Sequence, residues 1–250
     1  MKEIKTKSKV RVIKLFFENN VFIRLIKLLF TPKKLLKKIV SYKFNSSKVI
    51  KIDWKERSKI MGKYSVIDSQ TPKNEFNYVT KLQKKFLFLN LKKFLKGDEK
   101  KILDFGCGAG RFSVELAKLS KNVKVLGVDT EKNLIKIAKP FKHVKYLHAK
   151  NLKNVNGKFD VIFIANVLGG IEIEKLSKIS NFIYKKLKKN GILLLNENTT
   201  NLKLSKKEIL KEWSSRNENF YLKLFSNLNL KIVDSYKYLQ NNTSIFIGRK

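Results

Sequence analysis

The chain has very few residues of the kinds that build metal sites or covalent cross-links. Its 250 residues include one cysteine, Cys107, and two histidines, His143 and His148. An internal disulfide is therefore excluded, and neither histidine has a partner at metal-site spacing, so we expect no bound metal. No uncharged apolar run reaches the roughly 20 residues of a membrane-spanning helix. These absences predict a protein of the reducing cytoplasm.

Acidic residues are also scarce, and the imbalance of charge is large. There are 20 acidic residues against 56 basic ones, which gives a net charge of +36. Such a charge fits an anionic partner, either nucleic acid or a lipid surface, but it also fits a compositional excess of lysine. Nucleic-acid sites favour the planar fork of arginine. The even spread of lysine and the six scattered arginines make nucleic acid the weaker interpretation; the arginines are Arg11, Arg24, Arg57, Arg111, Arg216 and Arg249.

The first 48 residues form a basic and apolar extension. Polar residues recur every three or four positions from Arg24 to Lys38, with Leu, Ile and Phe between them, and Pro32 separates two predicted helices. Residues 10–44 therefore suit a peripheral contact with the inner face of a membrane, or a pair of helices that packs on the protein. Residues 49–97 are predicted to be a lead-in or lid that begins loop-like and continues as a helix over about 75–95.

From residue 98 the pattern changes to strands that alternate with helices. The apolar runs "ILDFG", "KVLGVD", "VKYLHA", "FDVIFIANVL" and "GILLLNEN" are separated by helical stretches at about 111–120, 131–141 and 172–189. This alternation predicts an α/β fold with a parallel sheet and helices on both faces. After helices near 205–213 and 219–228, the runs "KIVDSYKYL" and "SIFIGR" are joined by four residues only. That joint is too short for a parallel crossover, so the last strand should be antiparallel.

A glycine-rich turn follows the first of these strands. Gly106, Gly108 and Gly110 form G-x-G-x-G, and Arg111 occupies the next position. The turn lacks the third glycine position of a dinucleotide fingerprint and the Gly-Lys-Ser/Thr of a P-loop. Asp104 precedes the turn, and Asp129 ends the second strand, where a carboxylate can accept the hydroxyls of a ribose. A negative charge near the turn favours a ligand with a cationic group.

Four stretches together resemble the class I S-adenosylmethionine-dependent methyltransferases. They are "ILDFGCGAGRF", "VLGVDTEKNL", "GKFDVIFIANVLGGI" and "LKKNGILLLNEN", in the family's order over about residues 98–250. The resemblance implies a Rossmann-like, seven-stranded, mostly parallel sheet with an antiparallel last strand. It also implies S-adenosylmethionine as the cosubstrate. The departures are "YLHAKNL", where family members often carry an acid, and Gly169-Gly170, where many carry a histidine.

The resemblance further implies a role for individual residues. Glu197, after the fifth strand, is the candidate general base, and Leu168, Arg216 and Tyr64 are candidates for the substrate side. The predicted cosubstrate contacts are Asp104, Gly106, Cys107, Gly108, Gly110, Asp129, Thr130, Asn151, Asn166 and Val167.

The expected activity is methyl transfer to a hydroxyl of a small molecule or glycan, as in bacterial surface-polysaccharide biosynthesis. The lead-in segment is loosely similar to that of methyltransferases from such pathways. Two alternatives stay open. The basic charge fits an RNA methyltransferase, although "ANVL" stands where base-methylating relatives carry an Asn/Asp-Pro-Pro-Tyr/Phe motif. The second alternative is a relative that keeps the fold as a non-catalytic binding module.

Overall fold

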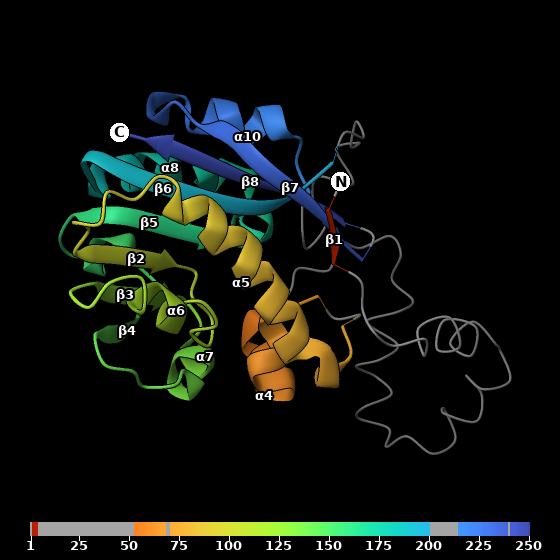
Figure 1. The fold of residues 1–250 in the computed structure, drawn as a ribbon. Helices are drawn as coiled ribbons and strands as arrows, with labels where there is room; N and C mark the ends of the chain where they lie inside the picture. Colours follow the sequence, from red (N-terminus) through yellow and green to blue (C-terminus); the bar gives the residue numbers. More distant parts are fainter. Residues whose placement is uncertain (1, 5–52, 69–70, 201–214, 240) are drawn as a thin grey trace, which may run out of the picture.

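The computed structural model describes residues 2–4, 53–68, 71–200, 215–239 and 241–250. Its centre is an eight-stranded sheet with the order β1-β7-β8-β6-β5-β2-β3-β4 (Figure 1). The strands are β1 (Lys2–Ile4), β2 (Lys101–Phe105), β3 (Lys124–Asp129), β4 (Val144–His148), β5 (Phe159–Ala165), β6 (Leu187–Thr199), β7 (Lys231–Tyr238) and β8 (Asn241–Arg249).

Seven of these strands match the predicted sheet. β8 runs antiparallel to both of its neighbours, β6 and β7, and every other pair is parallel. The mostly parallel sheet with an antiparallel last strand is therefore confirmed. The prediction missed β1, which adds an eighth strand parallel to β7 at the edge. A three-residue strand carries too little alternation to be detected in the sequence.

The helices of the described residues follow the predicted pattern, with shorter ends. They are α4 (Trp54–Met61), α5 (Phe76–Lys92), α6 (Ser113–Ala117), α7 (Lys132–Ile137), α8 (Ile173–Lys186) and α10 (Glu218–Leu224). The prediction of 131–141 for α7 was too long because Pro140 disfavours helical backbone just before it. The lead-in, expected to begin loop-like, begins instead with α4, which Asp53 caps by accepting a hydrogen bond from the N–H of Glu56 (3.0 Å).

Some predicted elements fall outside the described residues. These are the amphipathic helices of residues 10–44 and the helix near 205–213. None of the helices in the described ranges is long and apolar enough to cross a membrane.

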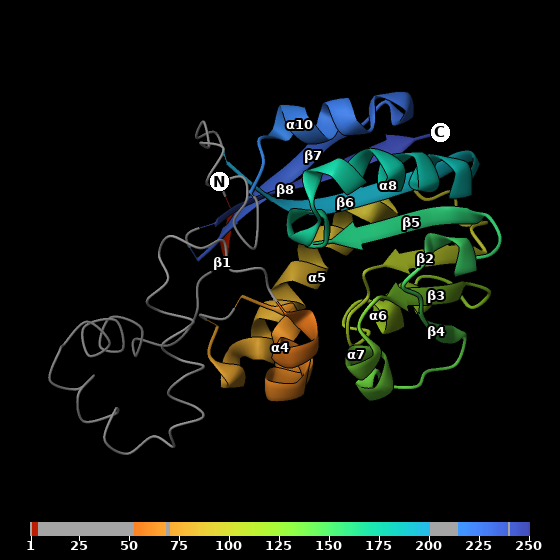
Figure 2. The same cartoon turned by 180° about the vertical axis from the view of Figure 1, so that it is seen from behind.

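Alternate residues of the central strands pack on opposite faces of the sheet. On one face, Ile102 and Phe163 belong to a buried cluster with residues of α5 and α6. On the other face, Leu103 and Ile162 belong to a second cluster with residues of α8 and α10. Figure 1 shows α5 across the near face, and Figure 2 shows α8 across the opposite one. The strands are thus buried on both sides, as near-continuous apolar runs predict.

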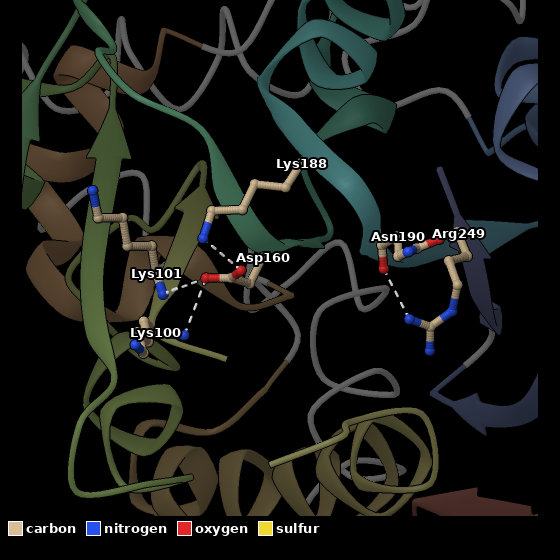
Figure 3. Close-up of polar contacts among 6 residues, drawn as sticks. All are labelled: Lys100, Lys101, Asp160, Lys188, Asn190 and Arg249. Atoms are coloured by element: carbon tan, nitrogen blue, oxygen red, sulfur yellow. Dashed lines mark hydrogen bonds and ion pairs between the residues drawn. The ribbon is translucent and has the colours of Figure 1, made fainter. Parts of the chain in front are cut away.

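A polar cluster fixes the strands at their amino-terminal edge. The pairing of β5 with β6 shifts register between Phe159 and Val161, and Asp160 lies at the shift. Its carboxylate accepts hydrogen bonds from the backbone N–H groups of Lys100 and Lys101 (3.0 and 2.8 Å) and from Lys188 Nζ (2.7 Å) (Figure 3). Nearby, Arg249 donates to the carbonyl of Asn190 (2.8 Å). These contacts join β2, β5, β6 and β8 at the edge away from the strands' carboxyl ends.

Candidate active site

A cavity of about 690 Å³ lies at the carboxyl ends of the strands. Ligands of open α/β sheets bind at this edge, where the loops that leave neighbouring strands diverge. The loops after β2, β3 and β5, the end of β6, the β7–β8 turn, and the segment from α4 to α5 all contribute to its wall. Its lining includes Trp54, Arg57, Val66, Asp68, Gln83, Asp104, Gly106, Cys107, Gly108, Arg111, Asp129, Thr130, Asn166, Val167, Ile171, Asn198, Tyr238 and Asn241.

The glycine turn brings main chain to the wall of this cavity. Gly106 and Gly108 have φ angles of +73° and +57°, a region that other residues rarely adopt. The N–H groups of Gly106 and Cys107 both donate to the carbonyl of Val128 (2.8 and 3.0 Å), which ties the turn to β3. A Cβ atom at position 106 would overlap the side chain of Val167. Glycine is therefore required at position 106 by both backbone angle and space.

Asp129 is held at the end of β3 by two backbone groups. Its Oδ2 accepts from the N–H of Gly108 and its Oδ1 from the N–H of Glu131, each at 2.8 Å. Burial raises the pKa of Asp129, and these backbone hydrogen bonds oppose the rise. Each carboxylate oxygen has two lone pairs, so each can accept one more hydrogen bond from the cavity side. The arrangement suits a pair of adjacent hydroxyls.

Asp104 is the second carboxylate of the cavity wall, and it is almost fully buried. Its Oδ2 accepts a hydrogen bond from the hydroxyl of Ser113 (2.6 Å). Burial raises the pKa of Asp104 to about 7, and the Ser113 hydrogen bond opposes this change, while the nearby negative charge of Asp129 adds to it. A carboxylate that is costly to ionise inside the protein is stabilised by a cation placed beside it. Asp104 therefore suits a ligand with an ammonium group.

Glu197 does not line the cavity, which contradicts the expectation of a general base. Its side chain is fully buried beneath the loop that follows β5. The carboxylate accepts hydrogen bonds from the backbone N–H groups of Val167 and Leu168 (2.7 Å each) and Gly169 (3.2 Å). Burial raises the pKa of Glu197 to about 7, while these N–H groups and Arg216 favour its ionised form. Its position makes it a brace for the loop.

Arg216 is the second part of this brace and also lies outside the cavity. Its guanidinium donates to the carbonyls of Leu168 (2.8 Å) and Ile171 (2.9 Å) and is buried. Leu168 is itself a fully buried core residue. Neither residue lines the cavity, so the geometry does not support the prediction that Arg216 and Leu168 meet the substrate. Both residues fix the main chain that carries Val167 and Ile171, which do line the cavity.

Three further predicted residues lie away from the cavity wall. Gly110 faces Tyr146, whose ring occupies the space that a Cβ would need. Asn151 caps the short turn Leu152–Asn154 by accepting from the N–H of Lys153 (3.0 Å). Tyr64 packs edge-on against Phe76, with ring centroids 5.2 Å apart. The other predicted cosubstrate residues are brought together on the wall: Asp104, Gly106, Cys107, Gly108, Asp129, Thr130, Asn166 and Val167.

Sequence reasoning missed the part of the wall that comes from α4, α5 and the ends of β6, β7 and β8. Trp54 and Arg57 come from α4, and Arg57 holds the following segment by donating to the carbonyls of Ser65 and Ile67 (3.0 Å each). The remainder is rich in amide and hydroxyl groups: Gln83, Asn198, Tyr238 and Asn241. For Asn198, Tyr238 and Asn241 the position at a strand end was the available signal, but polar residues also occur at strand ends without a functional role; Gln83 lies within α5.

The part of the chain that the structure describes contains no group of three His, Cys, Asp or Glu residues that could hold a metal ion. The chemistry of the wall includes the carboxylates of Asp104 and Asp129, a glycine turn, the guanidinium of Arg111 and several amides. This combination defines a nucleoside-binding α/β protein with an adjacent polar chamber.

Comparison with known proteins agrees with this class. The family profile described as "Methyltransferase domain" matches residues 96–243, more than half of the chain. The chain therefore belongs to the methyltransferase-domain family, and the resemblance found in the sequence is confirmed.

The relatives and solved structures cover the chain to different extents. A carboxy-S-adenosyl-L-methionine synthase of Nautilia profundicola is 31% identical over 123 residues, which are 46% of this chain and 52% of that protein. A synthase of the same name from Campylobacter jejuni is 31% identical over 101 residues, 38% of this chain and 43% of that protein. The chain thus spans about half the length of the curated relatives it matches.

Two solved structures share the fold. The magnesium protoporphyrin IX methyltransferase of Synechocystis, solved with S-adenosylhomocysteine (SAH) bound, superposes with a TM-score of 0.58 at 17% identity. The match covers 86% of this chain and 99% of that one. A methyltransferase of Archaeoglobus fulgidus gives 0.53 at 16% identity, over 68% of this chain and 94% of that one.

Proposed function

We propose that this protein is an S-adenosylmethionine-dependent methyltransferase. Its membership of the methyltransferase-domain family supports the activity, and the observation that carries it is the carboxylate of Asp129. That carboxylate is fixed by two backbone N–H groups, faces the cavity and retains acceptor capacity on both oxygens. A ribose presents two adjacent hydroxyl donors that match this arrangement.

The residues present also fit the rest of the cosubstrate. The main chain at Gly106 and Gly108 can approach a ligand closely because no Cβ intervenes. Asp104, whose pKa burial raises to about 7, offers its negative charge to an α-ammonium group. When bound, S-adenosylmethionine supplies an electrophilic methyl group on its sulfonium. The protein's part is to align the acceptor with that group and to exclude water.

The other half of the cavity would receive the acceptor. The wall extends from Asp129 on β3 to Tyr238 on β7. Five strand spacings separate these strands, or about 24 Å at roughly 4.8 Å per spacing. Gln83, Asn198 and Asn241 line this chamber and can donate and accept hydrogen bonds. Amide groups around a chamber suit an acceptor rich in hydroxyls, so we favour O-methylation of a small polar molecule or glycan of bacterial surface-polysaccharide or related biosynthesis.

Asp68 is the carboxylate best placed to take a proton from such an acceptor. It lines the chamber, and Asn241 Nδ2 donates to its Oδ2 (3.3 Å). Glu197 is unsuited because both of its oxygens are engaged by backbone N–H groups beneath the loop. The Asp68→Asn variant should keep cosubstrate affinity and lower the turnover rate by about 100-fold or more, the usual contribution of general base catalysis.

The activity can be tested by following the cosubstrate and its products together. Purified protein with S-adenosylmethionine would be incubated separately with cell-surface glycan and with total RNA, and SAH would be measured by mass spectrometry. SAH formed only with glycan supports the proposal, whereas SAH formed only with RNA favours the RNA methyltransferase alternative. Carboxy-S-adenosylmethionine should also be monitored because of the named relatives. Failure to bind SAH in calorimetry would refute the proposal and favour a non-catalytic module.

The place of action is part of the same proposal. We place the protein in the cytoplasm, with residues 10–44 as a peripheral contact at the inner face of the membrane. The basic and apolar sequence of that stretch supports the contact. A variant with Leu25, Leu28 and Leu36 replaced by Gln should bind anionic vesicles more weakly than the native chain in a sedimentation assay. Equal binding would argue against the membrane role.

A further inference from the structure

The arginines of the described residues separate into two kinds. Arg57, Arg216 and Arg249 each donate to two backbone carbonyls and so hold segments of the chain together. Arg57 donates to the carbonyls of Ser65 and Ile67, Arg216 to those of Leu168 and Ile171, and Arg249 to those of Asn190 and Phe94. A guanidinium engaged in this way has a structural task that accounts for its presence.

Arg111 differs from all three. It is partly buried, lines the cavity and makes one hydrogen bond, from Nη1 to Gln83 Oε1 (2.6 Å). Its guanidinium carbon lies 4.3 Å from the ring centroid of Phe112. Within the described ranges, no carboxylate forms an ion pair with it at 4.0 Å or less. Four of its five N–H donors therefore have no protein partner in this part of the chain.

The electrostatic setting of Arg111 calls for an anion. Burial lowers its pKa to about 10, while Tyr236, Tyr238 and Asp104 favour the charged form, so the guanidinium stays a cation at neutral pH. A partly desolvated cation that has no carboxylate in ion-pair contact is stabilised further when an anion pairs with it. The planar fork of arginine also matches a carboxylate or phosphate through two parallel hydrogen bonds.

The position of Arg111 lies between the two halves of the cavity. It follows the glycine turn directly, and its electrostatic neighbours are Asp104 on the β2 side and the two tyrosines of β7. Gln83 of α5 accepts a hydrogen bond from one nitrogen of the guanidinium, and both residues line the cavity. A ligand that spans both halves would pass this cation.

We propose that Arg111 binds an anionic group, a carboxylate or a phosphate, of a ligand in this cavity. The anion has two possible sources, the carboxylate at the amino-acid end of the cosubstrate or an acidic group of the acceptor. The identity of the cosubstrate in this inference rests on the proposed function. The presence of an anion site at Arg111 does not rest on it.

The experiment compares two ligands that differ in the amino-acid end. SAH carries the carboxylate, and 5′-methylthioadenosine lacks the whole amino-acid part. Calorimetry would measure both with the native protein, Arg111→Gln and Arg111→Lys. Arg249→Gln is the matched control because Arg249 lies at the opposite edge of the sheet and holds only main chain. A second arm would measure the shift of the thermal midpoint that inorganic phosphate causes in the SAH-loaded protein.

Two results support the proposal and assign the source. Arg111→Gln could weaken SAH binding about tenfold or more and change the affinity for 5′-methylthioadenosine by no more than about twofold. In that case the anion is the cosubstrate's carboxylate. If SAH binding is unchanged but phosphate stabilises the native protein and not Arg111→Gln, the anion belongs to the acceptor. Arg111→Lys should retain part of either effect because it keeps the charge without the fork.

Other results overturn one proposal without the other. Equal SAH binding together with an equal phosphate response in native protein and Arg111→Gln would show that Arg111 binds no anion. If the native protein binds neither nucleoside, the methyltransferase proposal fails instead. The phosphate arm, then run on the protein alone, would still decide the role of Arg111.

Discussion

The raised pKa of Asp104 should make cosubstrate binding depend on pH in a calculable way. An α-ammonium group beside Asp104 favours the ionised carboxylate, whereas the free protein holds a proton there below a pKa of about 7. The proton must therefore leave when the ligand binds. At about pH 6 roughly one molecule in eleven is already ionised, and at about pH 7.5 roughly three quarters are, so affinity should be about eightfold weaker at the lower pH.

Calorimetry of SAH binding in buffers of different ionisation enthalpy gives a direct assay of this proton. Binding should release about 0.9 proton at about pH 6 and about 0.2 at about pH 7.5. Asp104→Asn should bind more weakly and release almost no proton. Glu197 also has a pKa of about 7, so the variant is needed to assign the proton. Proton release that is absent in the native protein, or that persists in Asp104→Asn, would refute the reasoning.

Three further substitutions test separate parts of the site. Asp129→Ala should weaken SAH binding by about 1–3 kcal/mol in calorimetry because charged hydrogen bonds to two hydroxyls are lost, and unchanged affinity would contradict the ribose assignment. Gly106→Ala should lower the free energy of unfolding in urea, and adding Val167→Ala should recover part of that loss because it removes the two methyl groups that a Cβ at position 106 would overlap. The roughly 1–2 kcal/mol of left-handed backbone strain should remain, and no recovery would argue against the steric explanation. Glu197→Ala should destabilise the protein by about 2–4 kcal/mol because it leaves buried N–H groups unpaired. The control Glu172→Ala, on the surface, should change the free energy of unfolding very little. Equal effects of the two substitutions would argue against the role of Glu197 as a brace.

The sheet could be predicted because its strands leave strong local signals. The runs that became β2, β3, β5 and β6 are apolar and separated by helical patterns, and the short joint before β8 requires an antiparallel pair. The glycine turn and Asp129 also follow from local sequence, since each lies at a strand end. Helix ends were less accurate because neighbouring turns and Pro140 override the apolar periodicity.

The role of Glu197 could not be found from motif position alone. The alternation of β6 contains the missing information: Leu193 and Leu195 pack on the face of α8, and Glu197 continues that series. Asn198, one residue further, points to the other side and lines the cavity. The wall formed by α4 and by Gln83 of α5 depends on packing between distant segments, which no local pattern specifies.

The brace formed by Glu197 and Arg216 under the loop after β5 has a consequence for how the shape of the cavity wall could change. Glu197 accepts hydrogen bonds from the main-chain N–H groups of residues 167–169, and Arg216 donates to the main-chain carbonyls of Leu168 and Ile171. These hydrogen bonds do not involve the side chains of Val167 and Ile171, which line the cavity and also pack against the buried cluster on the face of α8. Apolar substitutions of similar size at these two positions should therefore reshape the cavity wall and keep the loop in place, whereas substitutions at the fully buried Leu168 would remodel the core.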